Sequence, residues 1–289
     1  MIVMKSSGDF AWPWANATSK SEAEAIFAQT YPSIYRRFKG LESFKMDGKD
    51  KGLRHREDQG RFWWELRPCA YYASMDGPKI VYTEITWSNS FAFDEGNHFI
   101  NNTAYALPSI DHWIPTVLNS PLMWWYSWRK AQHGKDEALR FMDSFIRPFP
   151  LALCSPDDAS ESQERSAQLR TELDYVRRAD GAIADWIAHT FDPKTVPPVL
   201  REASKLDSDA FVAAVRAALP KRQGLTPTQL RQLRDAFAET ADPARAARSV
   251  LMAHERRLAA MVERAYDLTP EDVALMWRTA PPRMPLALQ

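Results

Sequence analysis

The chain has 289 residues and a mass of 33.1 kDa, enough for two domains of ordinary size. Its 37 Lys and Arg residues balance 37 Asp and Glu residues, which excludes a histone-like protein that binds through a uniform positive field but allows a local basic face. A hydrophobic fraction of 45% excludes a disordered chain. The sequence has no apolar run long enough for a membrane span, no signal-peptide pattern and only two cysteines without a CxxC motif, so we expect a cytoplasmic protein without disulfides.

The composition changes near residue 153. Residues 1–150 contain nine of the 11 tryptophans, whereas the remainder is rich in Ala, Leu, Arg and Glu. The polar stretch 153–160 separates the two parts and is typical of a boundary.

The first part mixes helix and strand patterns, in chain order. A helix is predicted over residues 21–29, interrupted at Pro32, and the polar segment 38–60 that follows has no sustained apolar period. The later segments with strand character are 62–66, 79–85 and 99–107, with a hairpin turn at 94–97. Helical spacing returns over residues 111–118, 121–130 and 136–146. This mixture predicts an α+β unit, in which Trp124, Trp125 and Trp128 face the core or a partner.

The second part is predicted to be helical throughout. Leu169, Leu173 and Val176 share one helix face, and further amphipathic segments begin near Ser208, Thr226 and Pro243. Residues 269–272 read Thr-Pro-Glu-Asp, a capping box with Pro at the first helical position. We therefore expect an all-α tail behind the α+β unit.

The motifs of several enzyme classes are missing. The sequence has no GxxxxGK[ST] loop, no GxGxxG turn, no HExxH and no GxSxG, and its six histidines are scattered singly, which predicts no metal site. No Asp…Glu-x-Lys cluster of a nuclease occurs. Ala280 precedes Pro281-Pro282, where a base-methylating enzyme carries Asn or Asp. No catalytic residues are predicted.

One segment combines basic and aromatic residues. Residues 36–67 contain ten basic and six acidic side chains, and the stretch from Gly60 to Tyr72 includes two Trp and two Tyr. Cationic side chains can neutralise phosphates or read a guanine edge, Asn can read adenine, and aromatic rings can accept an unstacked base. The residues alone equally describe aromatic core positions beside a solvated loop, and they favour that interpretation.

A family resemblance changes this weighting. The ordered pieces of residues 54–150 resemble the TaqI-type C-terminal specificity domain, the target-recognition part of adenine-specific DNA methyltransferases in restriction–modification and phage-defence systems. The segments that carry the resemblance are 63–66, 69–72, 78–85, 91–96, 101–108 and 118–126. Residues 20–38 look like the segment that joins methylase and recognition domain. Residues 208–212 and 266–277 look like the helical tail of fused methyltransferase–restriction enzymes.

The resemblance implies a division into three parts. Residues 1–40 would join the chain to a methylase, 41–153 would form the DNA target-recognition domain, and 154–289 the helical C-terminal region. In relatives, a class I methyltransferase domain supplies the S-adenosylmethionine loop and the catalytic motif, and neither occurs in this sequence. The implied partners are therefore double-stranded DNA and a methyltransferase, or methylase–nuclease, on another chain that binds S-adenosylmethionine. We expect no cofactor on this chain and no association with a membrane.

The resemblance also implies DNA-binding residues. Arg54, Arg56, Arg61 and Lys79 would contact phosphates or base edges. Each of the pairs Trp63-Trp64 and Tyr71-Tyr72 would divide by strand parity, with one member in the core and its neighbour toward DNA. The amides that would reach DNA are those of Asn89, Asn101 and Asn102, although turn-stabilising hydrogen bonds explain the last two equally well.

Two other hypotheses remain open. A protein-interaction or inhibitory subunit could dock on a methylase without reading DNA. An enzyme with a divergent nuclease site is the third, and the absence of a carboxylate–lysine cluster argues against it.

Overall fold

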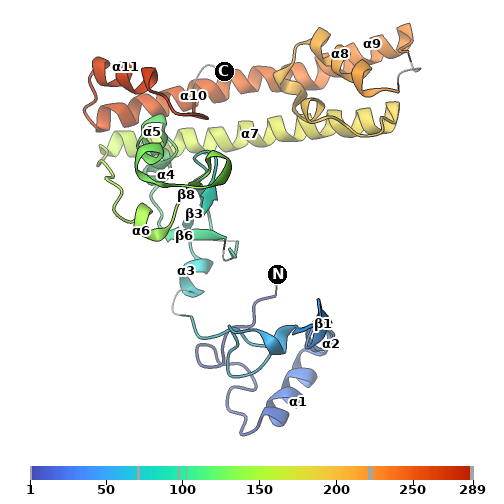
Figure 1. Cartoon of the computed structure of the whole chain (residues 1–289), viewed down its shortest axis with the longest axis vertical. Coiled ribbons are helices and arrows are strands. Elements are labelled where there is room, and N and C mark those ends of the chain that lie inside the picture. The colour runs from blue at the N-terminus through green and yellow to red at the C-terminus, as the bar shows by residue number, and fades with distance from the viewer. Residues whose placement is uncertain (1, 70–71, 97, 102, 221–223, 287–289) are drawn as a thin grey trace. The chain divides into compact units, whose positions relative to one another are not determined.

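A computed structural model describes residues 2–69, 72–96, 98–101, 103–220 and 224–286. The chain divides into two compact units, Met1–Gly77 and Pro78–Gln289, and each is described by itself (Figure 1). The division falls inside the stretch 41–153 that the sequence analysis assigns to a recognition domain.

The first unit is small, and its described residues form one two-stranded sheet, β1-β2. Ser19 caps its first helix by accepting a hydrogen bond from the Glu22 N–H, and Pro32 begins the second helix at the position where a missing N–H is harmless. Pro32 thus starts a helix rather than only ending one. The elements are α1 (Lys20–Thr30), α2 (Pro32–Lys39), β1 (Phe44–Met46), β2 (Lys49–Lys51), the 3-10 turn η1 (Leu53–His55) and α3 (Tyr72–Asp76).

Aromatic side chains form the core of this unit. Trp14 and Phe27 are fully buried, and Trp64 is 1% exposed. The Trp64 ring stacks on Phe62 at 5.0 Å between centroids and on Phe27 at 5.1 Å. Large aromatic rings bury much apolar area per residue, which suits a unit of this small size.

A buried carboxylate organises the polar part of the same core. Glu65 is 0% exposed, and its Oε1 accepts a hydrogen bond from the Trp14 indole at 2.7 Å. Its Oε2 accepts bonds from the Ser7 N–H and hydroxyl at 3.1 and 3.2 Å and from the Arg61 N–H at 3.1 Å. The Glu65 side chain therefore connects the N-terminal arm, which contains Ser7 and Trp14, to the aromatic turn of residues 62–66.

The second unit begins with two small antiparallel sheets. Strand β3 is central in the order β5-β3-β6, and β8 is central in the order β4-β8-β7. The register pairs Ile80 with Phe93 on one side and with Leu107 on the other. The strands are β3 (Lys79–Thr83), β4 (Ile85–Thr86), β5 (Ala92–Asp94), β6 (Ala104–Pro108), β7 (Gln132–His133) and β8 (Leu139–Arg140).

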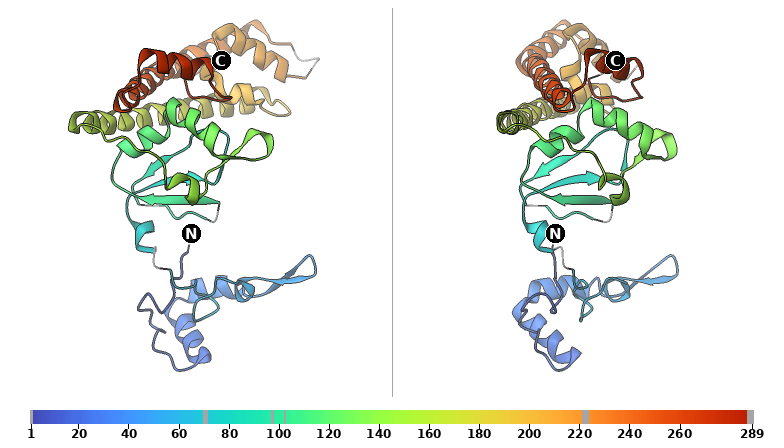
Figure 2. Two further views of the ribbon diagram at one scale, coloured as in Figure 1. Left: turned by 60° about the vertical axis from the view of Figure 1, so that its left-hand side comes forward. Right: turned by 90° about the vertical axis from the view of Figure 1, so that its left-hand side faces the viewer.

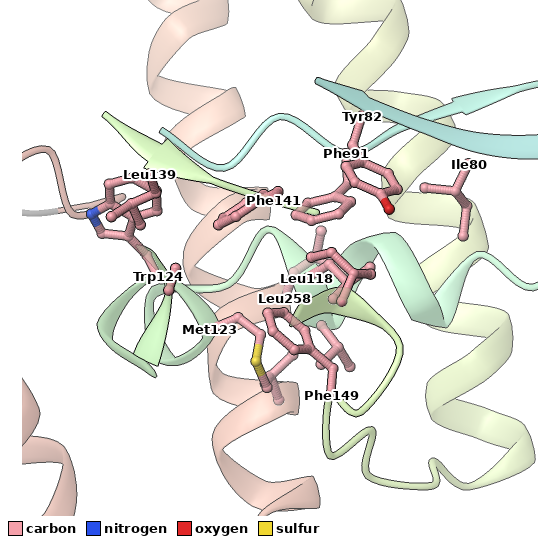
Figure 3. Packing of buried hydrophobic residues seen from close by; sticks show 14 of the residues in the cluster. Ile80, Tyr82, Phe91, Leu118, Met123, Trp124, Leu139, Phe141, Phe149 and Leu258 are labelled. Carbon is pink, nitrogen blue, oxygen red and sulfur yellow. The ribbon is translucent and has the colours of Figure 1, made fainter. Parts of the chain in front are cut away.

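Short helices and the C-terminal region cover these sheets with one continuous core. Figure 3 shows Leu258, from the C-terminal region, packed among Phe91, Phe141 and Phe149. Trp124 is fully buried, as the helical spacing indicates, and its indole donates to the Pro282 carbonyl at 2.8 Å. The short helices are α4 (Trp113–Leu118), α5 (Pro121–Lys130), the 3-10 turn η2 (Lys135–Glu137) and α6 (Asp143–Ile146).

The C-terminal region is all-α, as predicted. The long helices α7 and α10 run side by side (Figures 1 and 2). Their ion pairs join Arg248 to Asp180 and Arg264 to Asp158, an inverse order that makes the helices antiparallel. The elements are α7 (Pro156–Phe191), the 3-10 segment η3 (Pro198–Lys205), α8 (Ser208–Ala218), α9 (Pro227–Ala236), the π-helical turn η4 (Phe237–Ala241), α10 (Asp242–Ala265) and α11 (Pro270–Arg278). The α+β class with a helical tail is thus confirmed.

Three local predictions are wrong. Residues 62–66 form a turn with a single bridge between Gln59 and Leu66, not a strand. The strand expected over 99–107 begins only at Ala104. The helix expected over 136–146 is broken because Asp136 has a φ of 54° and strand β8 pairs with β4 and β7. Tertiary pairing overrides local helical spacing there.

A buried ion pair links β3 to the end of β5. Lys79 is 0% exposed, and its Nζ lies 2.5 Å from Oδ2 of Asp94. Burial alone would raise the pKa of Asp94, but hydrogen bonds from His98 and Lys79 outweigh it and lower the pKa to about 2. The carboxylate is therefore ionised throughout the physiological range.

Candidate nucleic-acid interface

The basic segment 36–67 is partly neutralised by its own carboxylates. Glu42 accepts hydrogen bonds from Lys39 at 2.7 Å and from Nε of Arg54 at 2.8 Å. Burial raises the pKa of Glu42, but these two partners lower it overall. Lys39 also reaches Glu24 at 2.8 Å, and both carboxylates raise the pKa of its ammonium group. Carboxylates of the same unit thus partly balance the charges of Lys39 and Arg54, whose side chains are 45% and 50% exposed.

Arg56 and Arg61 brace the backbone. Arg56 donates to the carbonyls of Glu65 at 2.9 Å and Leu53 at 3.3 Å. The guanidinium of Arg61 donates to the carbonyls of Ala15 at 2.7 Å and Ala17 at 3.0 Å. These bonds hold the N-terminal arm and the aromatic turn in place. Both arginines therefore have a structural role that is independent of any contact with DNA.

The parity expectation for Trp63 and Trp64 is wrong. Both rings are buried, at 7% and 1% exposure, because the segment is a turn rather than a strand with two faces. The Trp63 indole donates to Glu24 at 3.3 Å, and the cationic groups of Lys39 and Arg54 lie 5.5 and 5.6 Å from its ring. Neither ring is open to an unstacked base.

Lys79 also requires a correction. Its side chain is fully buried beside Asp94, so it lies inside the second unit rather than on a surface that DNA can reach. Lys79 and Ile80 are successive residues of β3 and point to opposite faces of the sheet, yet both are fully buried, so the face that carries Lys79 is covered as well.

The predicted amides belong to local turns and packing. Asn101 is exposed, and its Oδ1 accepts from the N–H and hydroxyl of Thr103 at 3.1 and 2.6 Å, the turn pattern that the sequence allowed. Asn89 donates to the Ser120 carbonyl at 3.3 Å and lines a cavity of about 570 Å³ together with His112 and Leu169. Their contact with DNA stays a prediction.

The tyrosine pair is described only in part. Tyr72 is half-buried in α3, its hydroxyl lies 3.5 Å from the Arg67 carbonyl, and the ammonium of Lys5 lies 5.7 Å from its ring. Tyr71 and Asn102, which the sequence analysis also assigns to DNA, lie outside the described residues.

A two-stranded hairpin in the first unit is exposed along both of its strands. Strands β1 and β2 pair antiparallel around Asp47 and Gly48, whose φ angles of 51° and 74° suit a tight two-residue turn. All six strand residues are exposed, and Figure 2 shows the hairpin extending from the body of its unit. The Asp-Gly dipeptide at this site is a strong hairpin signal, which the sequence analysis of the polar segment overlooked.

The hairpin and the helix before it carry exposed cations. Within the ranges that the structure describes, no acidic group forms an ion pair with Arg36, Arg37, Lys49 or Lys51. Of the cations predicted from sequence to contact DNA, Lys79 is buried, whereas the contacts of Arg54, Arg56 and Arg61 stay predictions.

Among the described residues, no group of three His, Cys, Asp or Glu side chains could hold a metal ion. None of the described helices is both long and apolar enough to span a membrane.

Two family models match the chain. Residues 35–151 match the model of the TaqI-like C-terminal specificity domain, which confirms the resemblance. Residues 158–262 match a domain of unknown function, DUF8810. No curated protein and no solved structure shows a significant match. The specificity-domain match includes the whole of the hairpin β1–β2.

Proposed function

We propose that the chain is the target-recognition part of a site-specific adenine-N6 DNA methyltransferase in a restriction–modification or phage-defence system. The match of residues 35–151 to the specificity domain is the observation that carries the proposal. In this role the chain binds duplex DNA and presents it to a methyltransferase on another chain.

The distribution of charge supports DNA as the partner. The sequence is neutral overall, whereas Arg36, Arg37, Lys49 and Lys51 are exposed cations within one compact unit. Phosphate contacts by such groups release counterions and supply affinity without sequence preference. A neutral total charge keeps this unspecific contribution moderate, which suits a module whose task is discrimination.

The chemistry belongs to the partner in this proposal. Methyl transfer to adenine N6 requires an extruded base and S-adenosylmethionine, which would bind to the methyltransferase chain. The chain described here contributes register and orientation, because phosphate contacts position a protein while base contacts specify the sequence.

Salt-dependent duplex binding tests this function. We expect the purified chain to bind a mixed-sequence duplex in fluorescence anisotropy, with an affinity that falls steeply between about 50 and 200 mM salt because each phosphate contact releases counterions. A variant with Arg36 and Arg37 changed to Ala should bind with a shallower salt dependence, because it makes fewer phosphate contacts. No binding at low salt, either alone or with the methyltransferase, would contradict DNA recognition and favour a protein-docking subunit.

A further inference from the structure

The hairpin β1–β2 has two faces of different chemistry. Directly paired residues in an antiparallel ladder point to the same side. The register pairs Phe44 with Lys51 and Met46 with Lys49, so these four side chains share one face, termed the reading face. The opposite face carries Lys45 and Asp50, whose charged groups lie 3.9 Å apart.

The reading face exposes large apolar side chains to solvent. Phe44 is 44% exposed and Met46 is 55% exposed, although both are apolar. The two lysines beside them form no ion pair with any residue in the described ranges, whereas Lys45 on the opposite face lies near a carboxylate. Apolar and cationic groups are thus gathered on one side of a thin, projecting ribbon.

This combination fits the major groove of duplex DNA. The groove is about 12 Å wide and admits a two-stranded β-ribbon. Lysine can donate to the O6 and N7 atoms of guanine, and apolar side chains contact the methyl group of thymine. The guanine O6 and N7 atoms and the thymine methyl group lie on the floor of the major groove. A reading face with Lys49, Lys51, Phe44 and Met46 would meet them there.

The base of the hairpin is held firmly. The Leu53 N–H donates to the Leu41 carbonyl at 2.9 Å, and the Arg54 N–H donates to the Glu42 carbonyl at 2.9 Å. Gly52 has a φ of 113°, and a Cβ there would lie 2.7 Å from the carbonyl oxygens of Leu41 and Glu42. Only glycine fits at position 52, where the chain passes close to the backbone of Leu41 and Glu42. The two backbone hydrogen bonds fix the hairpin on its unit before a ligand binds, which lowers the conformational entropy lost on binding.

We propose that the hairpin enters the major groove with its reading face against the base edges, and that Lys49 and Lys51 are specificity-determining contacts. The inference rests on the proposed DNA-recognition function and adds the element, the groove and the face that perform it.

Paired variants of the full chain test the two faces. In K49A/K51A we expect the affinity for guanine-containing duplexes to fall at least tenfold and the preference for them over duplexes of A·T pairs alone to be lost, because base contacts are removed. The matched control K45A/D50A removes one charge of each sign from the opposite face and should bind within about twofold of the parent. F44S/M46S should keep the salt slope and lose affinity for thymine-containing duplexes relative to duplexes with uracil, which lacks the methyl group.

Competition with groove binders tests the location. Methyl green, which occupies the major groove, should displace the parent chain, and distamycin, which occupies the minor groove, should leave it bound. Far-UV circular dichroism of each variant shows whether a loss of binding comes from unfolding.

The results separate the hairpin from the proposed function. If the parent binds duplex DNA while K49A/K51A binds equally well, or distamycin displaces the chain, the groove-reading role of the hairpin is wrong and DNA recognition stands. If the parent binds no duplex under any condition, both proposals fail.

Discussion

Replacing Glu65 with Ala is expected to destabilise the compact unit of residues 1–77 by about 3 kcal/mol or more. The carboxylate is 0% exposed and accepts bonds from the Trp14 indole, from Ser7 and from the Arg61 N–H. A buried donor left without an acceptor costs about 1–3 kcal/mol, and this change strands several at once. Because Glu65 ties the N-terminal arm to the aromatic turn, the whole unit should loosen.

Hydrogen exchange in the full chain measures this effect. The backbone N–H groups of α1 should exchange much faster in Glu65→Ala, while those of α7 should be unchanged because they lie in the other unit. Glu57 is exposed and near in sequence, so Glu57→Ala is the matched control and should exchange like the parent. Equal protection of α1 in Glu65→Ala and the parent would contradict the central position of this carboxylate.

Replacing Asp94 with Asn should cost the second unit about 3 kcal/mol at pH 7. The change removes the carboxylate that lies 2.5 Å from the buried Lys79 ammonium, and breaking a buried pair from one side is strongly destabilising. The pKa of Asp94 is lowered to about 2 in the folded chain, against about 4 when unfolded. Its contribution is therefore present above pH 4 and is lost as the pH falls toward 2.

Urea unfolding at a series of pH values checks both parts of this prediction. The parent should lose stability between pH 4 and 2, and Asp94→Asn should lose less over the same interval because it lacks the titrating group. Glu95→Gln removes a charge from an exposed pair with Arg170 and should cost under about 1 kcal/mol. If Asp94→Asn unfolds like Glu95→Gln at pH 7, the buried pair does not stabilise the sheet.

The sequence predicts the fold class and most helices because their signals are local. A capping box marks α11 and regular apolar spacing marks α5 and α9, and the structure has helices there; α1 begins at Lys20, one residue before the predicted start, with Ser19 as its cap. The segments 62–66 and 136–146 were mispredicted because their conformations depend on partners distant in the chain. Glu65 fixes the first through Trp14 and Ser7, and strand pairing of β8 fixes the second.

The candidate site was predictable as a region but not residue by residue. Composition locates the basic, aromatic segment, and the family resemblance gives it a role. Which cations are available depends on their neighbours in space: Arg56 and Arg61 bind backbone carbonyls, and Lys79 is buried. The one overlooked local signal, Asp47-Gly48, marks the hairpin on which Lys49 and Lys51 stay exposed and unpaired within the described ranges.

Selection from a pool of duplexes with a randomised centre tests the central claim most directly. The claim is that this chain recognises a particular DNA sequence, so repeated binding and amplification, with the chain alone and with its methyltransferase, should enrich one short motif. The enriched duplex should then bind at least tenfold more tightly than a scrambled duplex of the same composition at the same salt concentration. A pool that stays random after binding and amplification in both settings would contradict sequence recognition by this chain.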